Sequence, residues 1–386
     1  MKTTVPETTH YNPVESNLYM ALELGDKTWK LGFSVGLGQK ARLRNIAAAD
    51  RVALKREILR AKQRFGLPET AAVWSCYEAG REGFWIHRHL KSVDIENHVV
   101  DSSSIEVNRK ARRTKTDKLD VTKLVEMLIR YALGEKRVWR VVNVPSCQDE
   151  DDRHLHRALK TLKQERTAIA NRIRGLLKTQ GISWSASMAG LSQEALEKMR
   201  DWQGQELGAG MKSRLGPQIR GWRQLTTEIA ALEKQRLQLL RQEKGKKLDQ
   251  VRRLESLKGI GINGAWTLVM EALGWREFRN RREVGGFMGL TPSPYQSGAS
   301  SREQGISKAG NQWCRDVLGE LAWLWVQYQP TSDLTLWFEE RFAQAGPRAR
   351  KIGIVALGRK LVIQLWQYVE WGVIPPGAVF YSRLSS

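Results

Sequence analysis

The 386-residue sequence has only three cysteines and six histidines, which is few for its length. Cys76, Cys147 and Cys314 lie far apart and form no CxxC pair, so their spacing indicates neither a zinc ribbon nor a disulfide framework. No apolar run approaches the length of a membrane span, and the polar N-terminal residues contain no apolar signal core. We therefore expect a cytoplasmic protein in a reducing compartment, with no membrane partner.

Acidic residues are also scarce relative to basic ones. The chain has 41 Asp and Glu against 63 Lys and Arg, which gives a formal net charge of +22. Such a charge attracts polyanions, so nucleic acid is the first partner to expect. The same charge would fit a ribosomal or chromatin-type protein that binds phosphate backbones without doing chemistry. Charge therefore predicts binding and leaves the reaction open.

The N-terminal third alternates between strand and helix patterns. Residues 17–36 read as two apolar strands joined at Gly25-Asp26, a dipeptide typical of a hairpin turn. The pattern then predicts a basic amphipathic helix, a buried strand, a helix, a strand and a closing helix, over residues 49–66, 70–76, 84–90, 95–100 and 121–133. This alternation predicts an α/β domain with at least one parallel pair of strands.

The middle of the chain carries a heptad pattern. Apolar residues and one arginine recur at alternating steps of four and three over residues 155–176, and the pattern returns over residues 222–239. A break spans residues 181–216. Two long helices are expected, either as a helical hairpin, as a dimerising coiled coil or as a face of an ordinary helical bundle.

The last third changes character at Leu254, where we expect short helices punctuated by glycine. The segment LKGIG, followed by an apolar helix, resembles a helix-hairpin-helix, in which Gly259 and Gly261 would let backbone N–H groups approach a phosphate. A simple turn between helices is the alternative. The tail after Pro330 is expected to be helical and rich in tryptophan.

Four carboxylates are candidates for chemistry on phosphodiesters, which requires acids that converge on divalent metal ions. Glu23 lies in the first strand, Glu78 follows a later one, and Asp117 and Asp120 share one face if they are helical. Each also has an ordinary explanation, such as helix capping or charge balance. A strongly basic run beside them would suit a phosphate substrate, and its candidate nucleic-acid-binding residues are Arg109, Lys110, Arg112, Arg113 and Lys115.

A serine is the second candidate for chemistry. Ser297 precedes a glycine in an expected exposed loop, and Arg302 and Lys308 could hold a phosphate beside it, as a nucleophile attacking phosphorus would require. No histidine lies near it in sequence, so a Ser-His-Asp triad is not supported. On the residues alone, the alternatives to Ser297 stay open: Ser293, Ser300, Ser301 and Ser307.

These motifs together resemble the DEDD transposases of the IS110 insertion-sequence family, including its IS1111 branch, described as bridge-RNA-guided recombinases. Residues 18–128 resemble the family's RuvC-like domain of the RNase H fold, through YEAG at residues 77–80 and KTDKLD at residues 115–120. Residues 254–328 resemble its transposase domain, through LKGIG, GFMGLTP, YQSG and GISKAGN. The two blocks cover about half of the chain, and their order is specific.

The resemblance implies roles for individual residues. Glu23, Glu78, Asp117 and Asp120 would bind Mg²⁺, and Ser297 of YQSG would attack DNA covalently, as in a serine recombinase. The first acid of the family is normally aspartate, whereas this chain has Glu23, with Asp26 three residues later. Either a shifted carboxylate at Glu23 or the use of Asp26 would accommodate this difference.

The resemblance also implies an architecture and partners. It predicts a RuvC-like domain over residues 1–145, a helical coiled-coil region with an insertion over 146–250, and a transposase domain with a helical tail over 251–386. Dimers assembling to a tetramer would build active sites from two subunits, and a non-coding bridge RNA would pair with target and donor DNA in the bacterial nucleoid. A metal-dependent Holliday-junction nuclease and a non-catalytic nucleic-acid scaffold are the alternatives.

Overall fold

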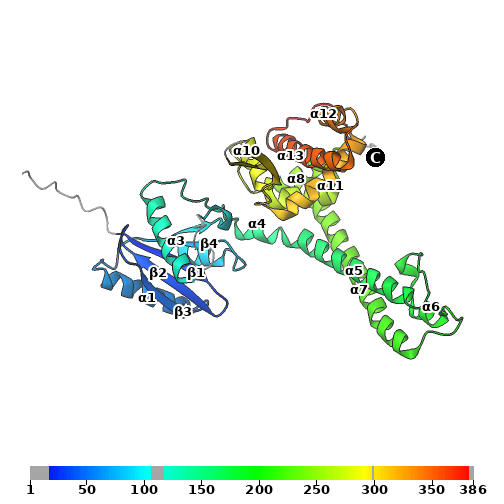
Figure 1. Cartoon of the computed structure of the whole chain (residues 1–386), viewed down its shortest axis with the longest axis horizontal. Helices are drawn as coiled ribbons and strands as arrows, with labels where there is room; N and C mark the ends of the chain where they lie inside the picture. Colours follow the sequence, from blue (N-terminus) through cyan, green and yellow to red (C-terminus); the bar gives the residue numbers. More distant parts are fainter. Residues whose placement is uncertain (1–16, 106–116, 298–299, 382–386) are drawn as a thin grey trace, which may run out of the picture. The chain divides into compact units, whose positions relative to one another are not determined.

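The computed structural model describes residues 17–105, 117–297 and 300–381 (Figure 1), with the backbone alone described at 117–120, 293–297 and 300–304. The chain divides into two compact units, Met1–Val144 and Pro145–Ser386. The fold is mixed α/β, with a mixed sheet in the N-terminal unit and mainly helices in the C-terminal unit. Among the described residues, no helix combines the length and the apolar composition that crossing a membrane requires.

The N-terminal unit is built on a five-stranded sheet with the order β3-β2-β1-β4-β5. Strands β1, β4 and β5 are parallel, whereas β2 and β3 are antiparallel to their neighbours. The strands are β1 (Leu18–Leu24), β2 (Thr28–Ser34), β3 (Arg42–Ala47), β4 (Val73–Glu78) and β5 (Glu96–Val100). The expected hairpin and the expected parallel pairing are confirmed, whereas β3 was not predicted.

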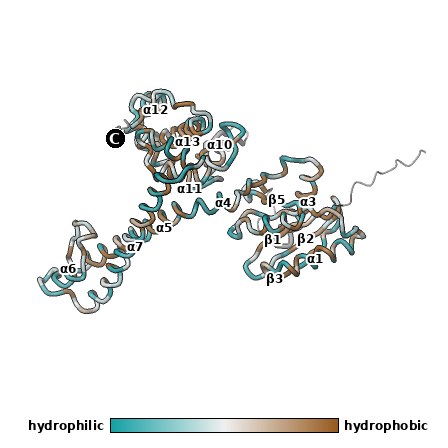
Figure 2. The backbone as a smooth tube through the Cα atoms, turned by 180° about the vertical axis from the view of Figure 1, so that it is seen from behind, coloured by the Kyte–Doolittle hydropathy of each residue, from teal (hydrophilic) through white to brown (hydrophobic). Residues whose placement is uncertain are grey.

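Helices cover both faces of this sheet because its central strands are apolar on both sides. Helices α1 (Arg51–Arg64) and α2 (Trp85–Lys91) pack against the face that carries Leu18, Met20 and Leu22. Helix α3 (Asp117–Ala132) packs against the opposite face, which carries Tyr19, Ala21 and Cys76. Figure 2 shows hydrophobic residues along these strands. Alternate residues of β1 therefore face different helices.

The C-terminal unit begins with α4 (Cys147–Asp151) and two long helices, α5 (His154–Lys178) and α7 (Ala209–Gln242), which pack against each other. Leu159, Ile173, Ile229 and Arg236 of the heptad pattern are buried. The helices thus form a hairpin within one chain, one of the three arrangements that the heptads allowed.

The expected break over residues 181–216 is folded. It holds the 3-10 turn η3 (Met188–Gly190), helix α6 (Gln193–Lys198) and the first turns of α7, which starts earlier than the heptads indicated. Leu191, Leu196 and Leu215 join Ile173 and Leu177 in a small core at this end of the hairpin. In Figure 1, α6 lies at the end of the hairpin that is distant from α8–α13.

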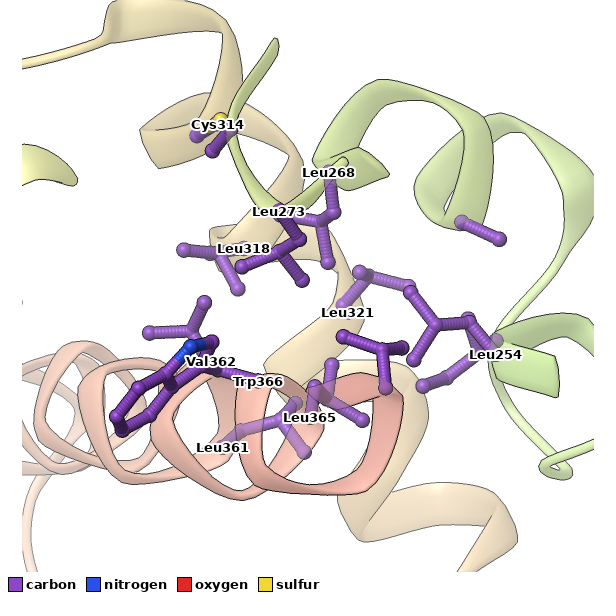
Figure 3. Packing of buried hydrophobic residues seen from close by; sticks show 14 of the residues in the cluster. Leu254, Leu268, Leu273, Cys314, Leu318, Leu321, Leu361, Val362, Leu365 and Trp366 are labelled. Carbon is purple, nitrogen blue, oxygen red and sulfur yellow. The ribbon is translucent and has the colours of Figure 1, made fainter. Parts of the chain in front are cut away.

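The remaining helices of this unit surround one large core (Figure 3), in which Leu254, Leu318 and Leu361 are fully buried. The elements are α8 (Lys246–Glu255), α9 (Ile262–Leu268), the π-helical turn η4 (Val269–Leu273), α10 (Arg281–Phe287), α11 (Gln312–Tyr328), α12 (Asp333–Phe342) and α13 (Pro347–Trp371). An antiparallel hairpin of β6 (Pro292–Ser297) and β7 (Ser300–Ile306) interrupts them. The expected short helices and the helical tail are present, whereas this hairpin was not predicted.

Candidate functional site

Glu23 and Glu78 occupy matching positions on neighbouring parallel strands. Leu22 of β1 pairs with Tyr77 of β4, so the two glutamates are the next residues in register at the carboxyl ends of these strands. Adjacent strands lie about 4.8 Å apart, and residues in register point to the same face. Glu23 is half-buried and Glu78 is exposed. The sheet therefore places two carboxylates side by side at one edge.

The face that carries these glutamates is the one covered by α3. Ala21, two residues before Glu23, pairs with Gly32 of β2, and a Cβ at Gly32 would lie 2.6 Å from Cγ1 of Val121. The missing side chain at Gly32 thus allows the first turns of α3 to approach the sheet closely. Asp117 is the first residue of α3 and Asp120 precedes Val121. Their backbone belongs to this face, while their side chains lie outside the described residues.

The alternative first acid, Asp26, has a different environment. It lies exposed in the turn between β1 and β2 and forms an ion pair with Arg81, which follows the YEAG segment. Asp101 is an acid that the sequence analysis missed, directly after β5 at the same edge of the sheet. Its carboxylate accepts a hydrogen bond from the backbone N–H of Ser103 at 2.9 Å and lies 3.6 Å from Nε of Arg140. Both aspartates thus have local structural roles.

A metal centre requires several ligands at once. Across the described side chains, no group of three or more His, Cys, Asp or Glu residues is arranged to hold a metal ion. Glu23 and Glu78 are among these side chains, whereas the side chains of Asp117 and Asp120 lie outside the described residues. The proposed set of four acids therefore remains a prediction.

Ser297 is the last residue of β6 and pairs with Ser300 of β7, so it lies in a strand at the tip of a hairpin and not in the expected loop. Of its side chain, and of those of Ser293, Ser300, Ser301 and Arg302, nothing is described. Ser307 lies beyond the hairpin, exposed, and its backbone N–H donates to the carbonyl of Thr291 at 2.8 Å. Position alone thus separates Ser307 from the serines near the tip.

The base of this hairpin is held by backbone hydrogen bonds between the motifs GFMGLTP and GISKAGN. The N–H of Lys308 donates to the carbonyl of Gly289 at 3.1 Å, and the N–H of Asn311 donates to that of Phe287 at 2.7 Å. Gly289 has a φ of 67° and Lys308 a φ of 55°. Arg315 Nη1 donates to the carbonyl of Lys308 at 3.0 Å. The hairpin that ends at Ser297 therefore stands on a firmly bonded base.

Beneath this base lies a buried carboxylate that the sequence analysis did not single out. Glu271, in the π-helical turn, is completely buried and is gripped by Arg157 through two hydrogen bonds of 2.7 and 2.8 Å. His156 Nε2 lies 2.8 Å from Oε1, and Asn311 Nδ2 donates to Oε2 at 2.9 Å. Asn311 also caps α11 by accepting from the N–H of Cys314. One carboxylate thus joins α5, η4 and the N-cap of α11.

The electrostatics of this cluster follow from its contacts. Burial by itself would raise the pKa of Glu271, but hydrogen bonds from His156, Arg157 and Asn311 lower that pKa to about 2. Burial lowers the pKa of His156, although Glu271 opposes the change. Glu271 is therefore charged at neutral pH and fully engaged, as expected for a carboxylate that stabilises the fold and not for one that does chemistry.

The predicted phosphate contacts have mixed outcomes. Arg109, Lys110, Arg112, Arg113 and Lys115 lie outside the described residues. Gly259 has a φ of 82°, and a Cβ there would lie 3.0 Å from the carbonyl oxygen of Leu324, so this glycine is explained by packing against α11. Gly261 precedes α9, and a Cβ at that position would have no neighbouring atom within 4 Å, so packing does not explain this glycine. Lys308 is exposed at the base of the hairpin.

The sequence analysis also missed a set of cations on α10 and α13. On α13, Arg348, Lys351 and Arg359 are separated by three and eight residues, which places them on one face of the helix, and this spacing could have revealed them.

Comparison with known proteins agrees with the motifs. Residues 251–335 match the family described as Transposase IS116/IS110/IS902. A Sinorhizobium fredii protein whose name assigns it as a transposase, y4rJ, is 38% identical over 373 residues, which cover 94% of this chain and 94% of that protein. The transposase for insertion sequence element IS1111A of Coxiella burnetii is 24% identical over 289 residues, with 74% of each chain covered. This chain belongs to the IS116/IS110/IS902 family of transposases.

Proposed function

We propose that this transposase cuts and rejoins DNA through a covalent bond to Ser297, assisted by Glu23, Glu78, Asp117 and Asp120, with a guide RNA that selects target and donor DNA. The observation that carries the acidic part is the register of β1 and β4, which sets Glu23 and Glu78 side by side on the face covered by α3. Membership of a transposase family supports DNA as the substrate.

The topology supports an N-terminal domain of the RNase H type. A five-stranded sheet with the order β3-β2-β1-β4-β5, two antiparallel strands on one side and parallel strands on the other, resembles the RuvC-like domain that the motifs imply. Carboxylates in such a sheet would lie at the carboxyl ends of the central strands, where Glu23 is the next-to-last residue of β1 and Glu78 the last residue of β4.

The described acids suit Mg²⁺ by their chemistry. Carboxylate oxygens are the ligands that this ion prefers, and strands about 4.8 Å apart would allow Glu23 and Glu78 to reach a common ion. When bound, Mg²⁺ would polarise the phosphate and stabilise the leaving oxygen. Lys30, opposite Glu23 on β2, adds a positive charge on the same face. Asp26 is the weaker candidate for first acid because Arg81 already pairs with it.

The serine step can be written for one strand. The Oγ of Ser297 bonds to phosphorus and loses its proton, while the bond from phosphorus to a deoxyribose oxygen breaks and that oxygen takes up a proton. The hydroxyl of a second DNA end then reverses the step, releasing Ser297 and sealing the new strand. Ser297 at the tip of a hairpin with a rigid base suits a nucleophile that must keep its position during the exchange.

The net charge of +22 supports binding of both DNA and a guide RNA. In such a system, base pairing reads sequence while the protein reads backbone and shape. A dimer that assembles to a tetramer would bring together the serines needed to exchange four strands, and the α5–α7 hairpin of each chain offers an extended surface for that assembly.

The test is a covalent-trapping assay. Purified protein is mixed with its element RNA, Mg²⁺ and labelled donor and target DNA, and the products are separated on a denaturing gel. We expect a protein–DNA adduct that needs RNA and Mg²⁺ and disappears in Ser297→Ala. Ser307→Ala is the matched control, because Ser307 lies beyond the hairpin, and it should keep the adduct.

Each alternative gives a different pattern. Cleavage without any adduct would replace the proposal with a metal-dependent nuclease, in which Ser297 is only structural. Tight binding of RNA without any cleavage would favour a scaffold. An adduct that forms in Ser297→Ala and is lost in Ser307→Ala would assign the role of nucleophile to Ser307.

A further inference from the structure

A groove of about 1250 Å³ lies in the C-terminal unit at the base of the β6–β7 hairpin. Pro292 and Ile306, at the base of the hairpin, line one part of it, while α10 and α13, with Leu334 of α12, line most of the rest. Basic side chains surround it, namely Arg281, Arg282, Arg348, Lys351, Arg359 and Lys360. Lys308 adds a seventh, and the lining contains no Asp or Glu. The groove is therefore strongly positive.

Helix geometry explains how α13 supplies most of this charge. Arg348, Lys351 and Arg359 recur on one face, while Leu357, Leu361 and Leu365 of the same helix are buried in the large core. Gly285 of α10 lies against the side chain of Arg359. A Cβ at this position would lie only 3.1 Å from Nε of Arg359. The small residue allows α10 and α13 to bring their cations into one groove.

Within the described residues, these cations lack acidic partners. In the part of the chain that the structure describes, none of the seven takes part in an ion pair. Lys360 instead lies over the ring of Trp337, 4.7 Å from its centroid. Like charges gathered without acids repel one another, so a site of this kind is best suited to a polyanion.

The dimensions match a nucleic-acid strand. From Arg348 to Lys360 the helix rises about 18 Å at 1.5 Å per residue, whereas each strand of duplex DNA carries one phosphate per about 3.4 Å of axis. The row could therefore face about five phosphates. Ile352, 58% exposed, and Val355 give the groove an apolar floor on which deoxyribose can pack.

The groove lies next to the β6–β7 hairpin, which indicates where the bound nucleic acid lies relative to Ser297. Ser297 is five residues beyond Pro292, a distance of about 17 Å along an extended strand. We propose that this groove binds the sugar–phosphate backbone of duplex DNA about five base pairs from the bond that is cut. The location relative to the cut rests on the proposed role of Ser297, whereas the choice of DNA as the bound polyanion rests on membership of a transposase family.

The test measures binding of labelled duplex DNA to the full-length protein by fluorescence anisotropy at a series of salt concentrations. The test variant is R348Q/K351Q. The control is K55Q/R56Q, which removes the same charge from exposed positions of α1 that form no ion pair within the described residues. Losing two phosphate contacts should lower the slope of log affinity against log salt by about 2 and weaken binding at least about 10-fold at 0.15 M salt, with the control near wild type.

The outcomes are distinct. Equal losses in the test and control variants would mean that only net charge matters and would overturn the inference. A loss confined to an RNA probe would also overturn it, because the groove would then hold RNA. Ser297→Ala should bind DNA with an unchanged slope, so failure of covalent trapping would contradict the serine role without touching the groove. Circular dichroism of R348Q/K351Q, compared with wild type, checks that the variant is folded.

Discussion

Glutamates in the two units of this transposase have opposite environments. Glu78 is exposed at the edge of a sheet, and Glu23 is half-buried beside it, both at the ends of parallel strands. Glu271 of the C-terminal unit is completely buried, and its two oxygens receive bonds from three side chains. The same residue type is thus accessible at a sheet edge in one unit and a fully bonded internal support in the other.

The difference shows what separates a candidate catalytic acid from a structural one. Glu271 has its full set of partners, so any substrate would have to compete with Arg157 and His156 for its oxygens. Glu78 is accessible and lies in register with a second carboxylate. Accessibility and convergence, and not the presence of a perturbed pKa, identify the acids worth testing for chemistry.

The largest effect should come from Glu78→Gln. We expect the rate of DNA cleavage to fall at least about 1000-fold, because a neutral amide cannot replace a carboxylate that holds a cation. The thermal unfolding midpoint of the protein should change little, because Glu78 is exposed. Single-turnover cleavage and thermal unfolding measure the two effects. Retained cleavage would remove Glu78 from the proposed acidic set.

Glu271→Gln should show the reverse pattern, a loss of about 3 to 5 kcal/mol in the free energy of unfolding of the C-terminal unit. The reason is that Arg157 would keep a charge beside a neutral amide in a buried site. Denaturant unfolding of the full chain measures it. A variant with normal stability and lost cleavage would break the comparison between the two units.

Acid should destabilise the C-terminal unit through the same cluster. The pKa of Glu271 is lowered from 4.5 to about 2, so about 3 kcal/mol of stability is present above pH 4.5 and is lost as pH falls toward 2. His156 acts in the same direction below its usual pKa of 6.5, because burial lowers its pKa in the folded state. Denaturant unfolding at several pH values measures this loss. In Glu271→Gln, the free energy of unfolding should depend less on pH between 4.5 and 2 than in wild type.

Gly32→Ala should destabilise the N-terminal unit by about 1 to 3 kcal/mol. Its Cβ would lie 2.6 Å from Val121 and 3.1 Å from Val125, so α3 must shift away from the sheet. Because α3 begins with Asp117, the cleavage rate should fall by more than the loss of stability explains. The measurement is the cleavage rate at saturating protein, at a temperature well below the thermal unfolding midpoint of the variant. Unchanged cleavage in folded protein would separate α3 from the acidic site.

Asp26→Asn should have the smallest effect, less than about 2-fold on cleavage. Its ion pair with Arg81 is exposed, and such pairs contribute little to stability. The same single-turnover assay measures it beside Glu23→Gln. A large loss in Asp26→Asn with normal activity in Glu23→Gln would exchange the roles of the two acids.

Much of the N-terminal unit could be predicted because its signals are local. The hairpin at Gly25-Asp26 and the alternation of strands and helices follow from turn chemistry and periodicity, and both are present. Strand β3, RLRNIA, carries few apolar residues and lies at the edge of the sheet, so its sequence gives little sign of a strand. Its pairing with β2 is a tertiary effect.

The C-terminal unit was harder to predict because its important contacts join distant residues. Glu271 and Arg157 are 114 residues apart, and nothing beside either of them in sequence announces the pair. The motif YQSG suggested an exposed loop, but pairing with β7 makes Ser297 the last residue of a strand. The basic groove likewise combines α10, α13 and the base of the hairpin.

The sequence by itself determined the family, the positive charge, the heptad helices and the candidate acids and serine, because motifs, composition and periodicity are properties of neighbouring residues. Only the tertiary structure decided that Glu23 and Glu78 share a register, that Glu271 is structural, and that cations from three elements line one groove. Those facts depend on strand pairing, burial and packing between distant segments, which local patterns do not encode.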